Sequence, residues 1–103
     1  MDKVNIAQSV FSRFKGLIGK KGLLPGEGLI IKPCKQVHTF YMRFPLDILF
    51  VDKKMQILHI ETLEPGKVGK FVSKAHFVLE VPVGTANDFG IFTGDYLKIE
   101  QLI

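Results

Sequence analysis

The chain of 103 residues has a single cysteine, Cys34, and no tryptophan. A lone cysteine cannot form an internal disulfide, whereas small exported domains of this size often depend on disulfides. No apolar run approaches the roughly 18–20 residues that a membrane-spanning helix needs. The N-terminal residues, with an acid at Asp2, lack the long apolar segment of a secretory signal. We therefore expect a cytoplasmic protein without a membrane span.

Motifs for cofactors and metals are also missing. The glycine-rich segment 84–95 lacks the G-x-G-x-x-G spacing of a dinucleotide loop, and no Walker lysine motif is present. Unless the chain bends after Pro33, an extended strand would hold the Cα atoms of Cys34 and His38 roughly 13 Å apart, too far for one zinc ion. We expect no cofactor, no metal, and a buried structural role for Cys34.

The net charge of +4 is unevenly distributed. Residues 1–35 carry seven lysines and arginines against two acids, whereas residues 36–103 carry seven against eight. Nucleic acid or an acidic protein is therefore a candidate partner, through Arg13, Lys15, Lys20 and Lys21. The simpler interpretation is that these side chains keep an exposed helix and loop in water.

The hydrophobic fraction of 47% is ample for one domain, residues 1–103. Ser9 is placed to cap an N-terminal helix, because apolar residues follow it at helical spacing as far as Ile18. Seven short segments then have the composition of strands: 4–7, 29–31, 36–42, 47–51, 56–64, 75–81 and 96–101. The prediction is a mainly β protein, a closed or partly closed barrel of about six to seven strands. Residues 51–56 would form a hairpin connection, and Thr85 would cap a helical turn near 85–89.

Charged and titratable residues interrupt two apolar segments. His38, Arg43 and Asp47 lie in HTFYMRFPLDILFVD (38–52), and Glu80 lies in HFVLEVPVG (76–84). A buried carboxylate needs a partner, and Pro45 marks a bend across which Arg43 and Asp47 are expected to meet. The four side chains would then form either a binding pocket or a structural polar network, and the sequence leaves both open.

The ordered motifs of this chain resemble the bacterial and archaeal family called domain of unknown function 192. They are RFKGLIGKKGL (13–23), GLIIKPC (28–34), HTFYMRFPLDILFVD (38–52), VLEVPVGTA (78–86) and GIFTGDYL (90–97). The resemblance implies a compact, β-rich, barrel-like domain with an N-terminal helix, and no established activity. Many relatives carry export signals or lipid anchors, whereas this chain is expected to begin directly at the domain.

The leading hypothesis is a non-catalytic binding module for a small anionic ligand or a protein partner. Its candidate ligand pocket consists of His38, Thr39, Met42, Arg43, Asp47 and Glu80. A rival hypothesis is a small hydrolase-like enzyme in which His38 acts as a general base with Asp47 or Glu80. The third is nucleic-acid or acidic-partner binding through the basic N-terminal third.

Overall fold

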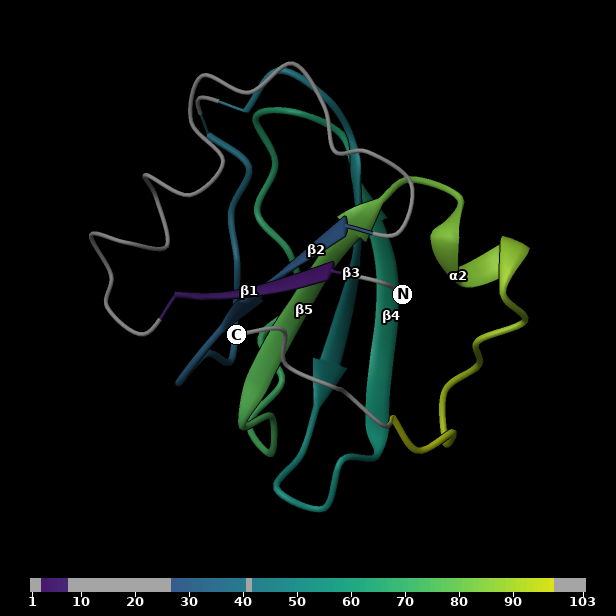
Figure 1. Cartoon of the computed structure of the whole chain (residues 1–103). Coiled ribbons are helices and arrows are strands. Elements are labelled where there is room, and N and C mark those ends of the chain that lie inside the picture. Colours follow the sequence, from purple (N-terminus) through teal and green to yellow (C-terminus); the bar gives the residue numbers. More distant parts are fainter. Residues whose placement is uncertain (1–2, 8–26, 41, 98–103) are drawn as a thin grey trace.

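The computed structural model describes residues 3–7, 27–40 and 42–97, which form a mainly β domain (Figure 1). Its elements are β1 (Lys3–Ala7), β2 (Glu27–Ile31), β3 (Leu46–Val51), β4 (Ile57–Leu63), β5 (Phe77–Pro82) and α2 (Thr85–Asp88). The strands form one sheet in the order β1-β2-β5-β3-β4. The β1–β2 pair is parallel, and the other neighbouring strands pair antiparallel.

The sheet is buried on both faces along its central strands. Every residue of β3 is buried, as are the first five residues of β5. Side chains alternate between the faces of a strand, so β3 contributes to two separate cores. We call the face with Leu46, Ile48 and Phe50 the ribbon face, and the face with Asp47, Leu49 and Val51 the helix face.

Two irregular segments, residues 33–40 and 64–76, cover the ribbon face, and we call them the covering ribbon. Backbone hydrogen bonds join them, from Thr39 N–H to Lys67 C=O at 2.8 Å and from Gly69 N–H to Val37 C=O at 2.8 Å. Val37 and Ala75 of this ribbon pack into the core of the ribbon face. The ribbon thereby closes the core without adding regular strands to the sheet.

The helix face is covered in part by the segment that follows α2, residues 89–97, which we call the strap. Ile91 and Leu97 of the strap pack against the buried side chains of this face. The strap is fastened to the start of β4, because Ile57 N–H donates to Asp95 C=O and Gly94 N–H donates to Ile57 C=O, both at 2.8 Å. Figure 1 shows α2 beside the sheet, after the end of β5.

Several predicted elements are confirmed. The hairpin at 51–56 connects β3 to β4, and the helical turn near 85–89 is α2. Thr85 does not cap this turn, because its hydroxyl donates to Pro82 C=O at 2.6 Å and Gly84 occupies the cap position.

The predicted barrel is wrong: the described strands form an open sheet of five strands in which β1 and β4 are the edges. Residues 36–40 of the predicted strand 36–42 belong to the covering ribbon, where His38 and Val68 form an isolated β-bridge outside the strands of the sheet. Only Tyr96 and Leu97 of the predicted strand 96–101 are described, and Tyr96 forms an isolated bridge with Gln56. The predicted N-terminal helix lies outside the described residues. Within the described part of the chain, no helix has the length and apolar character that crossing a membrane requires.

Candidate anion-binding pocket

The six residues of the predicted pocket do not converge on one cavity. Asp47 pairs with Val81 of β5 and therefore lies on the helix face, whereas Glu80 pairs with Ile48 and lies on the ribbon face. A one-residue difference in register thus places the two carboxylates on opposite sides of the sheet.

Asp47 is a structural residue that holds α2 against the sheet. Its carboxylate is 4% exposed and accepts hydrogen bonds from Thr62 Oγ1 at 2.7 Å, Gly84 N–H at 3.0 Å and Ala86 N–H at 3.2 Å. The last two donors belong to the helix N-terminus, where backbone N–H groups lack partners within the helix. Asp47 supplies from a distant strand the acceptor that a capping side chain usually provides.

The predicted ion pair between Arg43 and Asp47 is not formed. Arg43 is exposed, and it pairs with no carboxylate among residues 27–40 and 42–97. His38 is also exposed, and its ring stacks on that of Phe40 with centroids 4.7 Å apart. His38 belongs to the ribbon that covers the face opposite the one on which Asp47 lies. Catalysis by His38 with Asp47 or Glu80 stays a prediction. Ligand binding by His38 or Arg43 stays a prediction.

Thr39 and Met42 are the other two members of the predicted pocket. Thr39 is hydrogen-bonded within the covering ribbon, and Met42 packs against a core. Thr39 is fully buried, donates to Glu64 C=O at 2.6 Å and accepts from Lys67 N–H at 2.8 Å. Met42 packs against the core of the ribbon face. The candidate nucleic-acid residues Arg13, Lys15, Lys20 and Lys21 lie outside the described residues.

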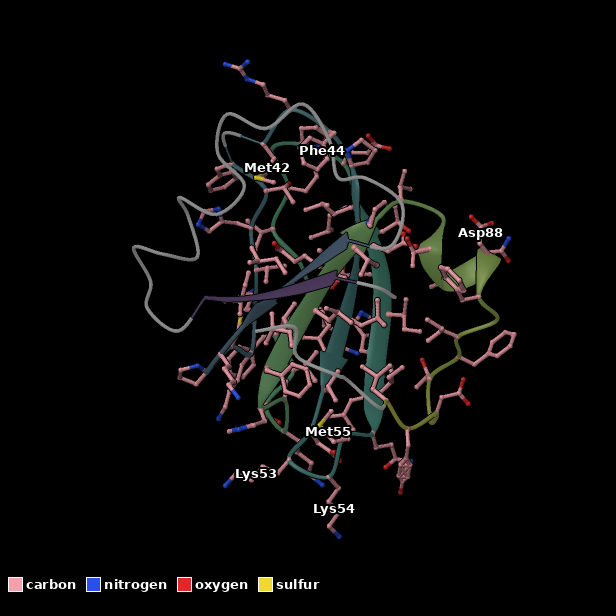
Figure 2. All side chains as sticks on the ribbon, in the orientation of Figure 1. Met42, Phe44, Lys53, Lys54, Met55 and Asp88 are labelled. Carbon is pink, nitrogen blue, oxygen red and sulfur yellow. The ribbon has the colours of Figure 1, made fainter. Side chains whose placement is uncertain are left out.

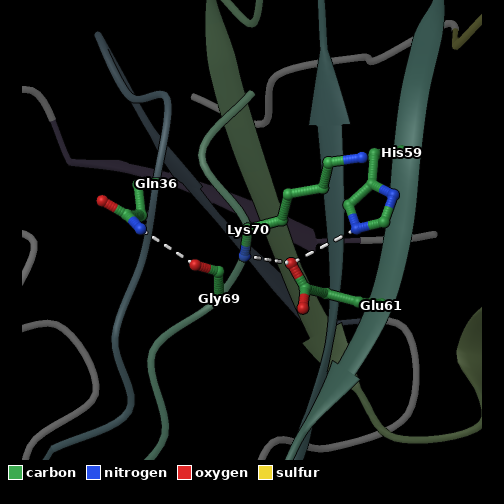
Figure 3. A network of polar contacts seen from close by, with 5 residues as sticks. All are labelled: Gln36, His59, Glu61, Gly69 and Lys70. Carbon is green, nitrogen blue, oxygen red and sulfur yellow. Dashed lines mark hydrogen bonds and ion pairs between the residues drawn. The ribbon is translucent and has the colours of Figure 1, made fainter. Parts of the chain in front are cut away.

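A polar network on the ribbon face joins the covering ribbon to β4 (Figure 3). Glu61 Oε2 accepts from Lys70 N–H at 2.8 Å and lies 3.4 Å from His59 Nε2. Gln36 Nε2 donates to Gly69 C=O at 3.0 Å within the ribbon. This network holds the covering ribbon against β4. It was not predicted from the sequence, because β4 and the ribbon are brought together only by the fold.

A pocket of about 550 Å³ lies at the end of the sheet where β2 and β3 end and β4 and β5 begin. Four connecting segments line it: 33–35, 52–56, 73–76 and the strap at Tyr96. Its basic residues are Lys35, Lys53, Lys54, Lys74 and His76. Figure 2 shows Lys53 and Lys54 at the tip of the β3–β4 hairpin, at the opposite end of the sheet from Met42 and Phe44.

The hairpin turn that presents Lys53 and Lys54 is shaped by Asp52. Asp52 Oδ1 accepts from Lys54 N–H at 2.9 Å and from Gln56 N–H at 3.0 Å. This local bonding supports the positive φ of 71° at Met55, a conformation that residues other than glycine seldom adopt. The only carboxylate lining the described pocket is therefore engaged in the turn.

The electrostatic character of the pocket is positive. Four lysines line it against one aspartate, and none of the four is paired with a carboxylate of the described residues. All four lysines are exposed. Such a surplus of unpaired positive charge around a concavity favours the binding of anions. Sequence reasoning missed this site because its lysines are scattered over forty residues of sequence, from Lys35 to Lys74.

Replacing Asp52 with alanine is expected to lower the free energy of unfolding by about 1 kcal/mol, because two turn N–H groups lose their acceptor near the surface. Urea denaturation of Asp52→Ala measures this loss. Lys53→Ala, at the next position of the same turn, is the control and should change stability by less than about 0.5 kcal/mol. Equal stabilities of Asp52→Ala and the wild type would show that the turn does not depend on this side chain.

Comparison with known proteins identifies the family. The chain belongs to the uncharacterized ACR family DUF192, which matches residues 1–99. It is 28% identical over 102 residues to the UPF0127 protein PH1112 of Pyrococcus horikoshii, covering 93% of this chain and 86% of that protein. It is 29% identical over 106 residues to the UPF0127 protein PYRAB11210 of Pyrococcus abyssi, covering 97% and 86%.

Two crystal structures share the fold. A protein of unknown function from Novosphingobium aromaticivorans superposes with a TM-score of 0.81 at 24% identity, over 93% of this chain and 74% of that one. A putative transcription regulator from Sinorhizobium meliloti superposes with a TM-score of 0.77 at 24% identity, over 92% and 79%. At this level of identity the likeness establishes the fold alone.

Proposed function

We propose that this protein is a binding module without catalysis of its own, and that the lysine-lined pocket captures a phosphate-bearing anion. The observation that carries the proposal is the set of four lysines that line one pocket without a carboxylate partner in the described chain. A bound anion would neutralise these lysines, which no carboxylate of the described chain does. Because the lysines come from three separate connections, a ligand would contact several of them at once.

The expected affinity is weak. Each exposed charge pair contributes roughly 0.2–1 kcal/mol, so four of them together would give a dissociation constant of about 1 mM at the tightest, at low salt. Binding should weaken as salt is added, because exposed charges are screened over about 10 Å at 0.1 M ionic strength.

Recognition by charge is favoured over catalysis for a chemical reason. A general base must be within hydrogen-bond reach of the proton that it removes. Two groups of the lining could act as a base: Asp52, whose Oδ1 already accepts two backbone hydrogen bonds, and His76. What the lining supplies in number is positive charge.

The test is isothermal titration with inorganic tripolyphosphate at low salt. Lys53→Ala/Lys54→Ala should lower the affinity about tenfold, which corresponds to about 1.4 kcal/mol for two charge contacts. The matched control is Lys67→Ala/Lys70→Ala, which removes two exposed lysines outside the pocket and should leave the affinity within about twofold of wild type. Equal losses in the two double variants would mean that net charge, and not this pocket, attracts the anion.

A further inference from the structure

The strap presents three large aromatic side chains to solvent. Phe89, Phe92 and Tyr96 are 61%, 69% and 62% exposed. Ile91 and Leu97 of the same segment point into the core of the helix face, so the strap has an inner aliphatic side and an outer aromatic side. The aromatic rings, which are larger than the aliphatic side chains, thus lie on the outer side of the strap.

The exposed rings belong to an ordered part of the hydrogen-bonded structure. Phe92 N–H donates to Asp95 Oδ2 at 2.8 Å, and Asp95 N–H donates to Phe92 C=O at 3.0 Å. This turn brings the Cα atoms of Phe92 and Asp95 within about 7 Å, next to Tyr96. Leu97 N–H donates to Met55 C=O at 2.8 Å, which fixes the end of the strap to the hairpin.

Exposure of these rings has an energetic cost. Burying one phenylalanine side chain typically contributes about 1.5–3 kcal/mol, and none of these three rings gains it in full. The position of Tyr96 links the rings to the basic site. Tyr96 belongs both to the strap and to the lining of the lysine pocket, so one of the three exposed rings lies at the basic site.

Basic residues beside exposed aromatic rings are the combination that binds single-stranded nucleic acid. Lysines contact the phosphates, and bases stack on the rings with little dependence on sequence. We propose that the ligand is a single strand of nucleic acid, with its phosphates at the lysine pocket and its bases against Phe89, Phe92 and Tyr96. This inference rests on the proposed anion-binding function.

The charge of the lining favours this ligand over a protein partner. An apolar protein surface would bind the three rings without needing Lys53, Lys54 or Lys74. Of the acids near the rings, Asp95 accepts a hydrogen bond from Phe92 N–H, and Asp88 is exposed in α2. The segment from Phe89 to Tyr96 has eight residues, and its seven steps reach at most about 23 Å when extended. A ten-nucleotide strand is within the site size of about 4–16 nucleotides per OB fold.

The experiment measures fluorescence anisotropy of labelled ten-nucleotide oligothymidylate and oligouridylate with the full chain, over a range of salt concentrations. Phe89→Ala/Phe92→Ala should weaken oligonucleotide binding by about tenfold or more, because each lost base stack is worth about 1–3 kcal/mol. It should leave the salt dependence unchanged. Lys53→Ala/Lys54→Ala should instead reduce the slope of log affinity against log salt by about 1.4. Phe71→Ala, at an exposed ring outside the strap, is the matched control and should bind as wild type does.

Tripolyphosphate separates the two proposals. Binding of tripolyphosphate to Phe89→Ala/Phe92→Ala should equal wild type, because neither ring lines the pocket. Oligonucleotide binding that ignores both rings would overturn the nucleic-acid inference and leave the anion site standing. Failure of oligonucleotide and tripolyphosphate alike to bind at low salt would overturn both proposals. Ring-dependent binding of poly-glutamate, equal to that of the oligonucleotides, would assign the surface to an acidic protein instead.

Discussion

Replacing Asp47 with alanine is expected to lower the free energy of unfolding by about 3 kcal/mol, since three hydrogen bonds are lost at a buried position. The backbone N–H groups of Gly84 and Ala86 would be left without their acceptor at the start of α2. Thr62 would also lose its partner across the β3–β4 ladder. Because α2 leads into the strap, which packs on the helix face, its loosening should expose part of that core. Urea denaturation followed by circular dichroism measures the change.

Two comparison variants make the interpretation of Asp47→Ala specific. Asp47→Asn retains one carbonyl acceptor and should lose about half as much stability. Asp88→Ala removes an exposed acid from α2 itself and should cost less than about 1 kcal/mol. A loss of stability in Asp88→Ala equal to that in Asp47→Ala would contradict the capping role, because net charge near the helix would then account for the effect.

Thr39→Val is expected to lower the free energy of unfolding by about 2 kcal/mol while keeping the shape of the side chain. The valine removes the hydroxyl that donates to Glu64 C=O and accepts from Lys67 N–H, at a site that water does not reach. These bonds hold the two halves of the covering ribbon together. Hydrogen exchange should therefore become faster in residues 64–76 than in β3 or β5.

Thr93→Val is the matched change at an exposed threonine of the strap, and it should alter stability by less than about 0.5 kcal/mol. If Thr39→Val were as stable as the wild type, the ribbon would be held by its apolar contacts alone. Hydrogen exchange that becomes faster by the same factor at all amides would likewise contradict a local role for Thr39.

Local patterns predicted much of the sheet. The strands β3 and β5 were indicated by their apolar, β-branched composition, and the hairpin connection by VDKKMQ (51–56). The segment 36–42 has the same composition, but its residues 36–40 form only an isolated bridge within the covering ribbon. Composition does not distinguish a regular strand from an extended covering segment, so the number of strands and the closure of the sheet were overestimated.

The candidate site was harder to predict, for a reason that Asp47 illustrates. A buried carboxylate in an apolar strand was correctly expected to need partners, and the nearest cation in the sequence, Arg43, was chosen. Its actual partners are the Thr62 hydroxyl and two backbone N–H groups thirty-seven and thirty-nine residues further along the chain. Backbone donors have no signature in the sequence, and the face of each residue depends on a register that only the fold defines. The lysine pocket was missed because its lysines are scattered along the sequence and come together only in the fold.

The most direct test of the central proposal is an amide chemical-shift map of the isotope-labelled chain titrated with inorganic tripolyphosphate. The anion-binding proposal predicts that the largest shifts fall on Lys35, Lys53, Lys54, Lys74 and His76. They should saturate together and be absent around Arg43 and His38, at the predicted pocket. Shifts concentrated on those two residues, or spread evenly over every exposed lysine, would contradict a binding site at the hairpin end of the sheet.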